Sequence, residues 1–119
     1  MMPSTIGEFE QLILLAILRQ KDEAYGVTIR RSIHEVTGRD VSAGAVYTAL
    51  GRLEQRGFVS SRVAATAPER SGQRRKYYQV HPEGAATLYR SYSDLQRMAG
   101  DVLLELQSLA AQEPFASGA

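Results

Sequence analysis

The segment from residue 42 to residue 57 constrains the fold most, because it encodes the core face and both ends of one helix. Ser42 is a favourable N-cap residue, and Gly57 is placed to end the helix. The apolar stripe along this helix consists of Val46, Ala49, Leu50 and Leu53. Phe58 and Val59 then begin an extended stretch. We therefore expect this helix to lead directly into a β-strand. The chain has 119 residues, which is about the size of one domain.

The opposite face of the same helix is small and neutral. Its residues are Ala43, Gly44, Tyr47, Thr48, Gly51 and Gln55, with Arg52 at the border. A helix surface that serves only solubility would carry glutamate and lysine instead. Each internal glycine costs about 1 kcal/mol relative to alanine. The two glycines therefore predict that something approaches this helix backbone closely.

A first helix is predicted over residues 5–20. Thr5 and Glu8 form a capping-box pattern, and an apolar set with helical spacing follows them. Because leucines also occupy the remaining sides, this helix is apolar nearly all round. A helix of this kind should be buried on more than one side. One small domain would hardly cover it alone.

A second helix and two strands complete the predicted domain. The second helix covers residues 25–37, and Gly38 is placed to end it. Its apolar stripe consists of Ile29, Ile33 and Val36. Strand-like runs at residues 58–65 and 74–80 are joined by a loop that contains proline and glycine, which is typical of a hairpin.

The remainder of the chain predicts one long helix over residues 82–113, followed by a flexible tail over residues 114–119. Pro82 suits the first helical position. A seam with heptad spacing consists of Leu88, Tyr92, Leu95, Ala99, Val102, Leu106 and Leu109. About 30 helical residues would be roughly 45 Å long, more than a small domain can cover. The seam thus predicts a dimer interface with a second chain; the alternative is that the helix folds back on its own domain.

Positive charge is concentrated in the middle of the chain. Residues 41–81 carry seven basic and two acidic side chains, whereas the segments on either side are mildly acidic. The second strand opens with Arg74, Arg75 and Lys76, so the charge gathers near the tip of the hairpin. A concentrated basic patch on an otherwise neutral protein is what a polyanion-binding face requires.

Several classes of function find no support. The chain has no cysteine and only two histidines, His34 and His81, so we expect no metal site and no cofactor. Neither a nucleophile with a neighbouring base nor a glycine-rich phosphate loop is present, which argues against an enzyme. No apolar run is long enough to span a bilayer, and the N-terminus does not resemble a secretory signal. We therefore expect a cytoplasmic protein.

The predicted order of three helices and a two-stranded hairpin is that of a winged helix-turn-helix, in which the third helix enters the major groove of DNA. Three blocks of the sequence carry a more specific resemblance. They are Ala24-Tyr25-Gly26-Val27, the run from Ser42 to Val59, and Gly72-Gln73-Arg74-Arg75-Lys76-Tyr77-Tyr78. In this order they resemble the PadR family of bacterial transcriptional regulators, in its short form with a single helix after the wing.

The resemblance implies a homodimeric repressor that binds a palindromic operator and is released by a small aromatic or lipophilic effector. It also implies that the C-terminal helix packs across the partner subunit, often against its first helix. The fold class expected is mainly α with a small β-hairpin, plus a long C-terminal dimerisation helix. Residues 1–81 would form the DNA-binding domain. The chain departs from some drug-sensing members in having no tryptophan, and Gly51 leaves base recognition at that position in doubt.

The residues predicted to contact DNA are Ser42, Ala43, Gly44, Tyr47, Thr48, Arg52, Arg74, Arg75 and Lys76. Short side chains at the start of the third helix would admit it to a groove about 12 Å wide, and free amides there could hold a phosphate. The basic strand would supply contacts to the phosphate backbone. Tyr47 has the alternative of packing inside the domain, and Arg52 that of pairing with a carboxylate.

An effector pocket is predicted from residues that combine apolar walls with a few polar groups. They are Phe9, Leu12 and Ile13 of the first helix and Tyr89, Tyr92 and Gln96 of the last. The same residues equally describe a plain packed interface. The alternative to a DNA-binding regulator as a whole is a winged-helix module that binds proteins and never contacts DNA.

Overall fold

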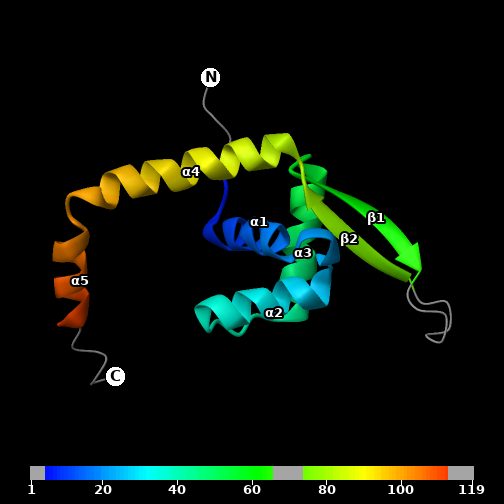
Figure 1. Cartoon of the computed structure of the whole chain (residues 1–119), viewed down its shortest axis with the longest axis horizontal. Coiled ribbons are helices and arrows are strands. Elements are labelled where there is room, and N and C mark those ends of the chain that lie inside the picture. Colours follow the sequence, from blue (N-terminus) through cyan, green and yellow to red (C-terminus); the bar gives the residue numbers. More distant parts are fainter. Residues whose placement is uncertain (1–4, 66–73, 113–119) are drawn as a thin grey trace. The chain divides into compact units, whose positions relative to one another are not determined.

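The computed structural model describes residues 5–65 and 74–112. The predicted hairpin loop and C-terminal tail lie outside these ranges. In chain order the elements are α1 (Glu8–Gln20), a 3-10 turn η1 (Lys21–Glu23), α2 (Gly26–Thr37), α3 (Ala43–Gln55), β1 (Val59–Ala65), β2 (Arg74–Val80), α4 (Pro82–Gly100) and α5 (Leu103–Ala111) (Figure 1). The predicted order of three helices, a hairpin and a helical C-terminal region is confirmed.

Two compact units divide the chain, and the first comprises residues 1–88. Its core brings together α1, α2, α3, the base of the hairpin and the start of α4. The side chains that are fully buried include Ile13, Leu14, Ile29, Val46, Leu50 and Leu53. The four predicted core residues of α3 are all buried, whereas Val36 of the α2 stripe is more than half exposed. Val36 lies in the last turn of α2, outside the core of this unit.

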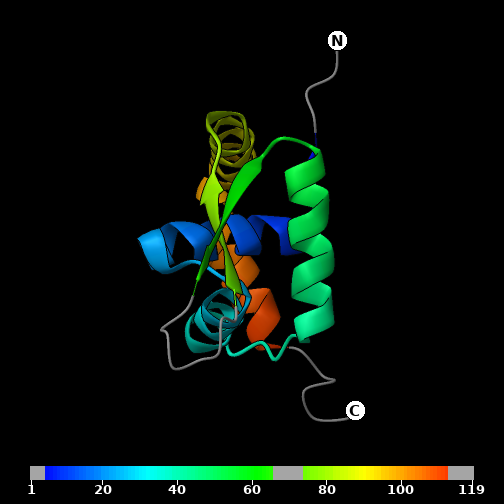
Figure 2. The same cartoon turned by 90° about the vertical axis from the view of Figure 1, so that its right-hand side faces the viewer.

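The hairpin is antiparallel and pairs Val59 with Val80 and Ala65 with Arg74. It is joined to the helices at its base, where the amide of Tyr78 donates to the carbonyl of Ala24 at 2.8 Å. Tyr78 and Val59 are buried, whereas Arg74 and Lys76, on the same face of β2 as Tyr78, are exposed. Figure 2 shows the hairpin and α3 in one view, with α1 crossing behind the strands.

The start of α1 differs from the prediction. The helix begins at Glu8 with Gly7 as its N-cap, and the capping box expected from Thr5 and Glu8 does not form. Instead, the carbonyl of Thr5 accepts a hydrogen bond of 2.6 Å from Arg56. Thr5 lies two residues before the N-cap, and its side chain does not cap α1.

The other helix ends follow local chemistry more closely. Gly38 ends α2 with φ 77°, a left-handed conformation that glycine adopts without strain, and Gly57 has φ 76° after α3. At the start of α2, the Thr28 hydroxyl accepts a hydrogen bond of 3.0 Å from the amide of Tyr25. That cap was not predicted from the sequence.

The prediction of a single helix from residue 82 to residue 113 is wrong. The helix is interrupted between Gly100 and Leu103, where Val102 has φ −119° and ψ 10°. Glycine is a poor helix former, and the aspartate that follows it favours helix ends over helix interiors. The heptad pattern continues through this point, but its residues belong to α4 and α5 separately.

The boundary of the first unit lies after Leu88, seven residues beyond the predicted end of the domain at residue 81. Leu88 is 5% exposed and belongs to the core of this unit, so its assignment to the dimer seam is also wrong. Gly84 packs against the backbone of Phe58 so closely that a β-carbon would not fit. The first two turns of α4 therefore belong to the packed domain.

The second unit comprises residues 89–119 and contains the rest of α4 together with α5. Its large apolar side chains are exposed, including Met98 at 80% and Leu104 at 81%. None of the helices within residues 5–65 and 74–112 is long and apolar enough to cross a membrane.

Candidate nucleic-acid interface

The outward face of α3 is exposed along its length, as predicted. Ala43, Gly44, Thr48 and Gly51 all contact solvent, and Tyr47 is 54% exposed. The Ser42 hydroxyl accepts a hydrogen bond of 3.0 Å from the amide of Ala45, which makes Ser42 the N-cap. The remaining amides of the first turn stay available to an anion at the end of the helix dipole.

Both glycines on this face stand over open space. A β-carbon built at Gly44 or at Gly51 would meet no atom of the described residues within 4 Å. Neither residue has a left-handed backbone, so neither conformation nor packing against the described residues requires glycine there. The two glycines leave this face open to a molecule that approaches from outside.

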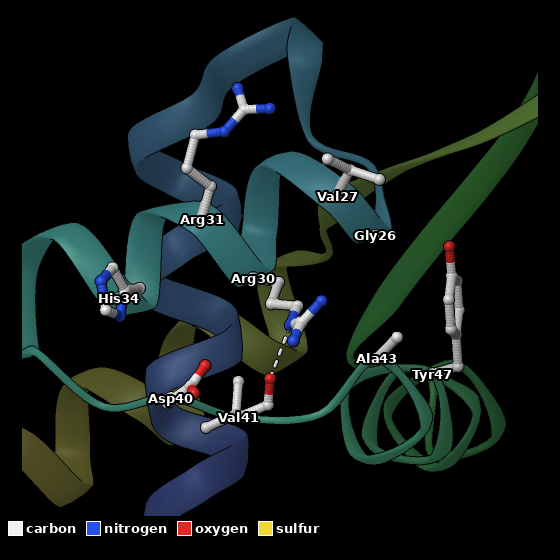
Figure 3. Close-up of a pocket in the computed structure, with 9 residues that line it drawn as sticks. All are labelled: Gly26, Val27, Arg30, Arg31, His34, Asp40, Val41, Ala43 and Tyr47. Carbon is white, nitrogen blue, oxygen red and sulfur yellow. Dashed lines mark hydrogen bonds between the residues drawn. The ribbon is translucent and has the colours of Figure 1, made fainter.

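The turn between α2 and α3 is held by Arg30. Its Nε donates a hydrogen bond of 2.6 Å to the carbonyl of Val41, immediately before the N-cap of α3 (Figure 3). A cavity of about 330 Å³ opens beside this contact and is lined by residues that include Arg31, His34 and Ala43. The sequence gave no sign of this contact, because it depends on the path of the turn.

Tyr47 projects from α3 toward the start of α2. Its phenol ring lies over Gly26, and its hydroxyl end points away from α3 (Figure 3). Tyr47 thus both packs against α2 and remains half exposed, so the two alternatives considered for it are not exclusive. Its position places a hydroxyl beside the N-terminus of α2 on an accessible surface.

One face of the hairpin carries alternating arginine and tyrosine side chains. The guanidinium of Arg75 lies 4.1 Å from the ring centre of Tyr25, and that of Arg62 lies 4.6 Å from the ring centre of Tyr77. The two tyrosine rings meet edge to face, with centres 5.5 Å apart. Arginine stacked in this way keeps its N–H groups available at the edge of the plane. Tyr25 therefore packs against the hairpin, and Arg62 joins the cationic surface although the sequence analysis did not select it.

The other face of the hairpin meets α3 through Glu54. One carboxylate oxygen lies 3.1 Å from Lys76 Nζ, and the other accepts a hydrogen bond of 2.6 Å from the Ser61 hydroxyl. Hydrogen bonds from Ser61 and Lys76 hold the pKa of Glu54 below its ordinary value, and the hydrogen bond to Glu54 raises the pKa of Lys76. Both groups are consequently charged at neutral pH. Sequence reasoning did not find this pair.

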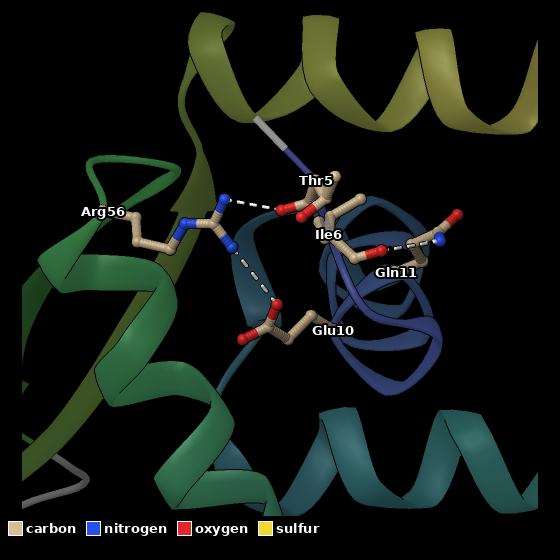
Figure 4. A network of polar contacts seen from close by, with 5 residues as sticks. All are labelled: Thr5, Ile6, Glu10, Gln11 and Arg56. Carbon is tan, nitrogen blue, oxygen red and sulfur yellow. Dashed lines mark hydrogen bonds and ion pairs between the residues drawn. The ribbon is translucent and has the colours of Figure 1, made fainter. Parts of the chain in front are cut away.

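Two arginines near the end of α3 have different surroundings. Arg56 donates to Thr5 and lies 3.5 Å from the carboxylate of Glu10, which ties α3 to the start of α1 (Figure 4). Arg52 makes no ion pair with any residue in the described ranges, so the carboxylate alternative finds no partner there. It lines a hollow together with Thr48 and Glu8. Arg52 is therefore available to an external anion.

The predicted effector residues are divided between the two units. Ile13 is completely buried in the core, so its prediction as a ligand contact is wrong. Phe9 and Leu12 are partly buried in the first unit, while Tyr89, Tyr92 and Gln96 belong to the second. Among the residues that the structure describes, no three His, Asp or Glu side chains lie close enough to hold a metal ion.

Solved structures of similar fold identify the architecture. A PadR family transcription regulator from Clostridium difficile has a TM-score of 0.65 and 26% identity over 82% of this chain and 98% of that one. A PadR-like transcription factor from Bacteroides fragilis has a TM-score of 0.66 and 24% identity, covering 79% and 85% of the two chains. Bacillus subtilis PadR, solved in complex with operator DNA, has a TM-score of 0.60 and 20% identity, covering 71% of this chain and 48% of that one.

None of the curated proteins compared matches the chain. The family model described as the transcriptional regulator PadR-like family, however, matches residues 14–90, which is more than half of the sequence. That segment contains the second and third helices, the hairpin and the start of α4. On the strength of this match and of the shared winged helix, the chain belongs to the PadR-like family of transcriptional regulators.

Proposed function

We propose that this chain is a cytoplasmic, homodimeric repressor that binds a palindromic operator sequence through α3 and the hairpin and is released by a small-molecule effector. The observation that carries the proposal is the outward face of α3. It presents small, uncharged side chains and two glycines over open space, at a cost in helix stability that no contact among the described residues explains. A major groove is a partner that requires such a slim surface.

The basic hairpin supports the second contact. Arg74 is exposed, and Arg75 and Arg62 are held by the rings of Tyr25 and Tyr77. In winged helices the hairpin lies beside the recognition helix, against the sugar–phosphate backbone. Cations in that position release counterions on binding and supply affinity that does not depend on sequence. The operator complex of Bacillus subtilis PadR, which shares the fold, supports DNA as the partner.

Exposed apolar surface supports the homodimer. Residues Tyr92, Leu95, Val102, Leu106 and Leu109 of the predicted seam are each about half exposed or more. In the first unit, Leu12, Leu15, Leu18 and Val36 line an apolar groove of about 370 Å³ between α1 and α2. Exposed apolar surfaces of this kind are typical of subunit interfaces. We propose that the C-terminal helices of one subunit cover α1 of the other.

Effector release would act at residues predicted on α1 and in the second unit. Phe9 and Leu12 on α1, together with Tyr89, Tyr92 and Gln96, remain candidate contacts after the exclusion of Ile13. An apolar molecule bound among them would alter the subunit interface and hence the distance between the two α3 helices. Release by this route requires an effector that prefers the conformation unable to bind the operator.

Selection of bound duplexes from fragments of the source genome tests the function. The chain is expected to enrich fragments that share an inverted repeat, and its affinity for them should fall steeply as salt increases. A matched duplex with one half-site scrambled is the control. Failure to retain any duplex at low salt would favour the protein-binding module over the regulator.

A further inference from the structure

Lys76 differs from the other cations of the hairpin in what surrounds it. It lies on the face of β2 that meets α3, and its Nζ is 3.1 Å from Glu54 and 5.8 Å from the ring centre of Tyr78. Arg74 lies on the same face, two residues closer to the tip, and makes no ion pair with a described residue. A phosphate that approached Lys76 would meet an ammonium group that the Glu54 carboxylate already contacts.

Glu54 connects α3 to both strands at once. Ser61 of β1 binds one carboxylate oxygen, and Lys76 of β2 binds the other. In the register of the hairpin, Ser61 pairs with Tyr78 and Val63 pairs with Lys76, so the two contacts lie on one face and along adjacent strands. A carboxylate held in this way resists both sliding and rotation of the hairpin against the helix.

The position of the bridge along the hairpin indicates what the bridge does. The base of the hairpin is fixed by buried Val59 and Tyr78, whereas Val63, nearer the tip, is 53% exposed. On the opposite face of the hairpin, Tyr25 packs against Tyr77 and Arg75. On the face that meets α3, little apolar packing beyond the core sets the angle to that helix. With side-chain exposures of 48% for Lys76 and 36% for Glu54, the pair adds little to overall stability. The pair instead affects the orientation of the hairpin relative to α3.

We propose that Glu54, Ser61 and Lys76 form a bridge that sets the angle between the hairpin and α3, and that Lys76 is a positioning residue rather than a phosphate contact. This inference rests on the proposed function and deepens it. It assigns a role in DNA binding to an acidic side chain that stands beside the DNA-binding surface. It also revises the expectation that Arg74, Arg75 and Lys76 act alike.

The substitution Glu54→Gln distinguishes a positioning role from a purely electrostatic one, because the two roles predict opposite changes in DNA affinity. Removing a negative charge beside a polyanion strengthens binding if electrostatics alone decide, because Lys76 becomes free and repulsion is lost. If Glu54 positions the hairpin, the same substitution weakens binding, by about 3- to 10-fold. Glu35→Gln is the matched control: it makes the same charge change on the exposed surface of α2, at a side chain without an ion pair in the described ranges.

The experiment measures affinity for a duplex that the unmodified full chain selects from random-sequence DNA, by fluorescence anisotropy at several salt concentrations. Glu54→Gln, Lys76→Met and the double variant are compared after thermal unfolding has verified that each one folds. We expect each single variant to bind more weakly by a similar factor and the double variant to bind no more weakly than either, because both substitutions break one bridge.

Two results would overturn the inference alone. One is tighter binding by Glu54→Gln; the other is a double variant whose loss is the product of the single losses, with a salt slope reduced by about one for Lys76→Met. A chain that binds no duplex at low salt would overturn the proposed function as well, so the two failures are distinguishable. Glu54→Asp supplies a rescue test, because a restored carboxylate should recover part of the affinity.

Discussion

The phenol ring of Tyr47 on α3 lies so close over Gly26, the first residue of α2, that a β-carbon at position 26 would overlap with it (Figure 3). Gly26→Ala should therefore displace the ring. Because Tyr47 is half exposed and can swing outward, the free energy of unfolding should change by less than about 1 kcal/mol. If the Tyr47 hydroxyl donates to a phosphate or base edge, DNA affinity should fall by about tenfold.

A double-variant comparison checks that this loss acts through Tyr47. Tyr47→Phe removes only the hydroxyl and should lower affinity to a similar degree. Adding Gly26→Ala to Tyr47→Phe should then cost little more. Fully additive losses, measured by anisotropy on one duplex, would show that position 26 acts by a separate route.

Replacing a glycine on the outward face of α3 with alanine should stabilise the protein and weaken DNA binding. Gly51→Ala is expected to raise the free energy of unfolding by about 0.5–1 kcal/mol, because alanine is the better helix former and the space around residue 51 is open. Gly44→Ala should give a smaller gain, since Gly44 lies in the first turn. Both variants should bind the selected duplex more weakly, because the added methyl groups face the groove. Urea unfolding and anisotropy measure the two effects, and a gain in stability with unchanged affinity would remove this face from the interface.

Contacts between the hairpin and DNA phosphates should appear in the salt dependence of binding. Replacing Arg74 and Arg75 with alanine should weaken binding to all duplexes similarly and reduce the slope of log affinity against log salt by about two. Arg90→Ala together with Arg97→Ala removes the same charge from α4 and is the control. An unchanged slope after the Arg74 and Arg75 substitutions would place the hairpin away from the phosphates.

Charged residues in the apolar seam should separate the subunits. Leu95→Glu and Leu106→Glu introduce charges on α4 and α5 at side chains that are 63% and 56% exposed in the single chain. We expect monomers in sedimentation experiments and poor operator affinity, because two half-sites about 34 Å apart are no longer engaged together. Gln107→Glu, outside the seam on α5, should leave the dimer intact. Dimers that survive both leucine substitutions would mean that the seam is misassigned.

The sequence predicted the parts of the fold that depend on local patterns. The α3 helix was correctly placed because its cap, its stripe and Gly57 lie within one segment. The break after Gly100 was missed because the heptad spacing runs through it, and spacing alone does not record backbone geometry. Leu88 was misassigned for the same reason, since a seam residue and a core residue look alike on one helix.

Contacts between segments that are distant in the sequence could not be predicted from local patterns. Glu54 and Lys76 both belong to polar stretches, and only the packing of the hairpin on α3 brings them to 3.1 Å. Arg56 likewise donates a hydrogen bond to the carbonyl of Thr5, 51 residues earlier in the sequence. Ile13 could not be separated from Leu12, because a helix that is apolar on every side gives no indication of which side enters the core.

The bridge between Glu54 and its partners should make stability depend on acid pH. Hydrogen bonds from Ser61 and Lys76 lower the pKa of Glu54 in the folded chain below the ordinary 4.5. The contribution of Glu54 is therefore fully present above that ordinary value and is lost as pH falls through the lower pKa of the folded state. At pH 7 the unmodified chain should be more stable than Glu54→Gln, by less than about 1 kcal/mol because the pair is partly exposed. Thermal unfolding near pH 3 should show a smaller difference in stability between the unmodified chain and Glu54→Gln. For Glu35→Gln, the difference from the unmodified chain should not change comparably with pH. If the difference for Glu54→Gln stays constant from neutral to acid pH, the carboxylate gains nothing from Ser61 and Lys76.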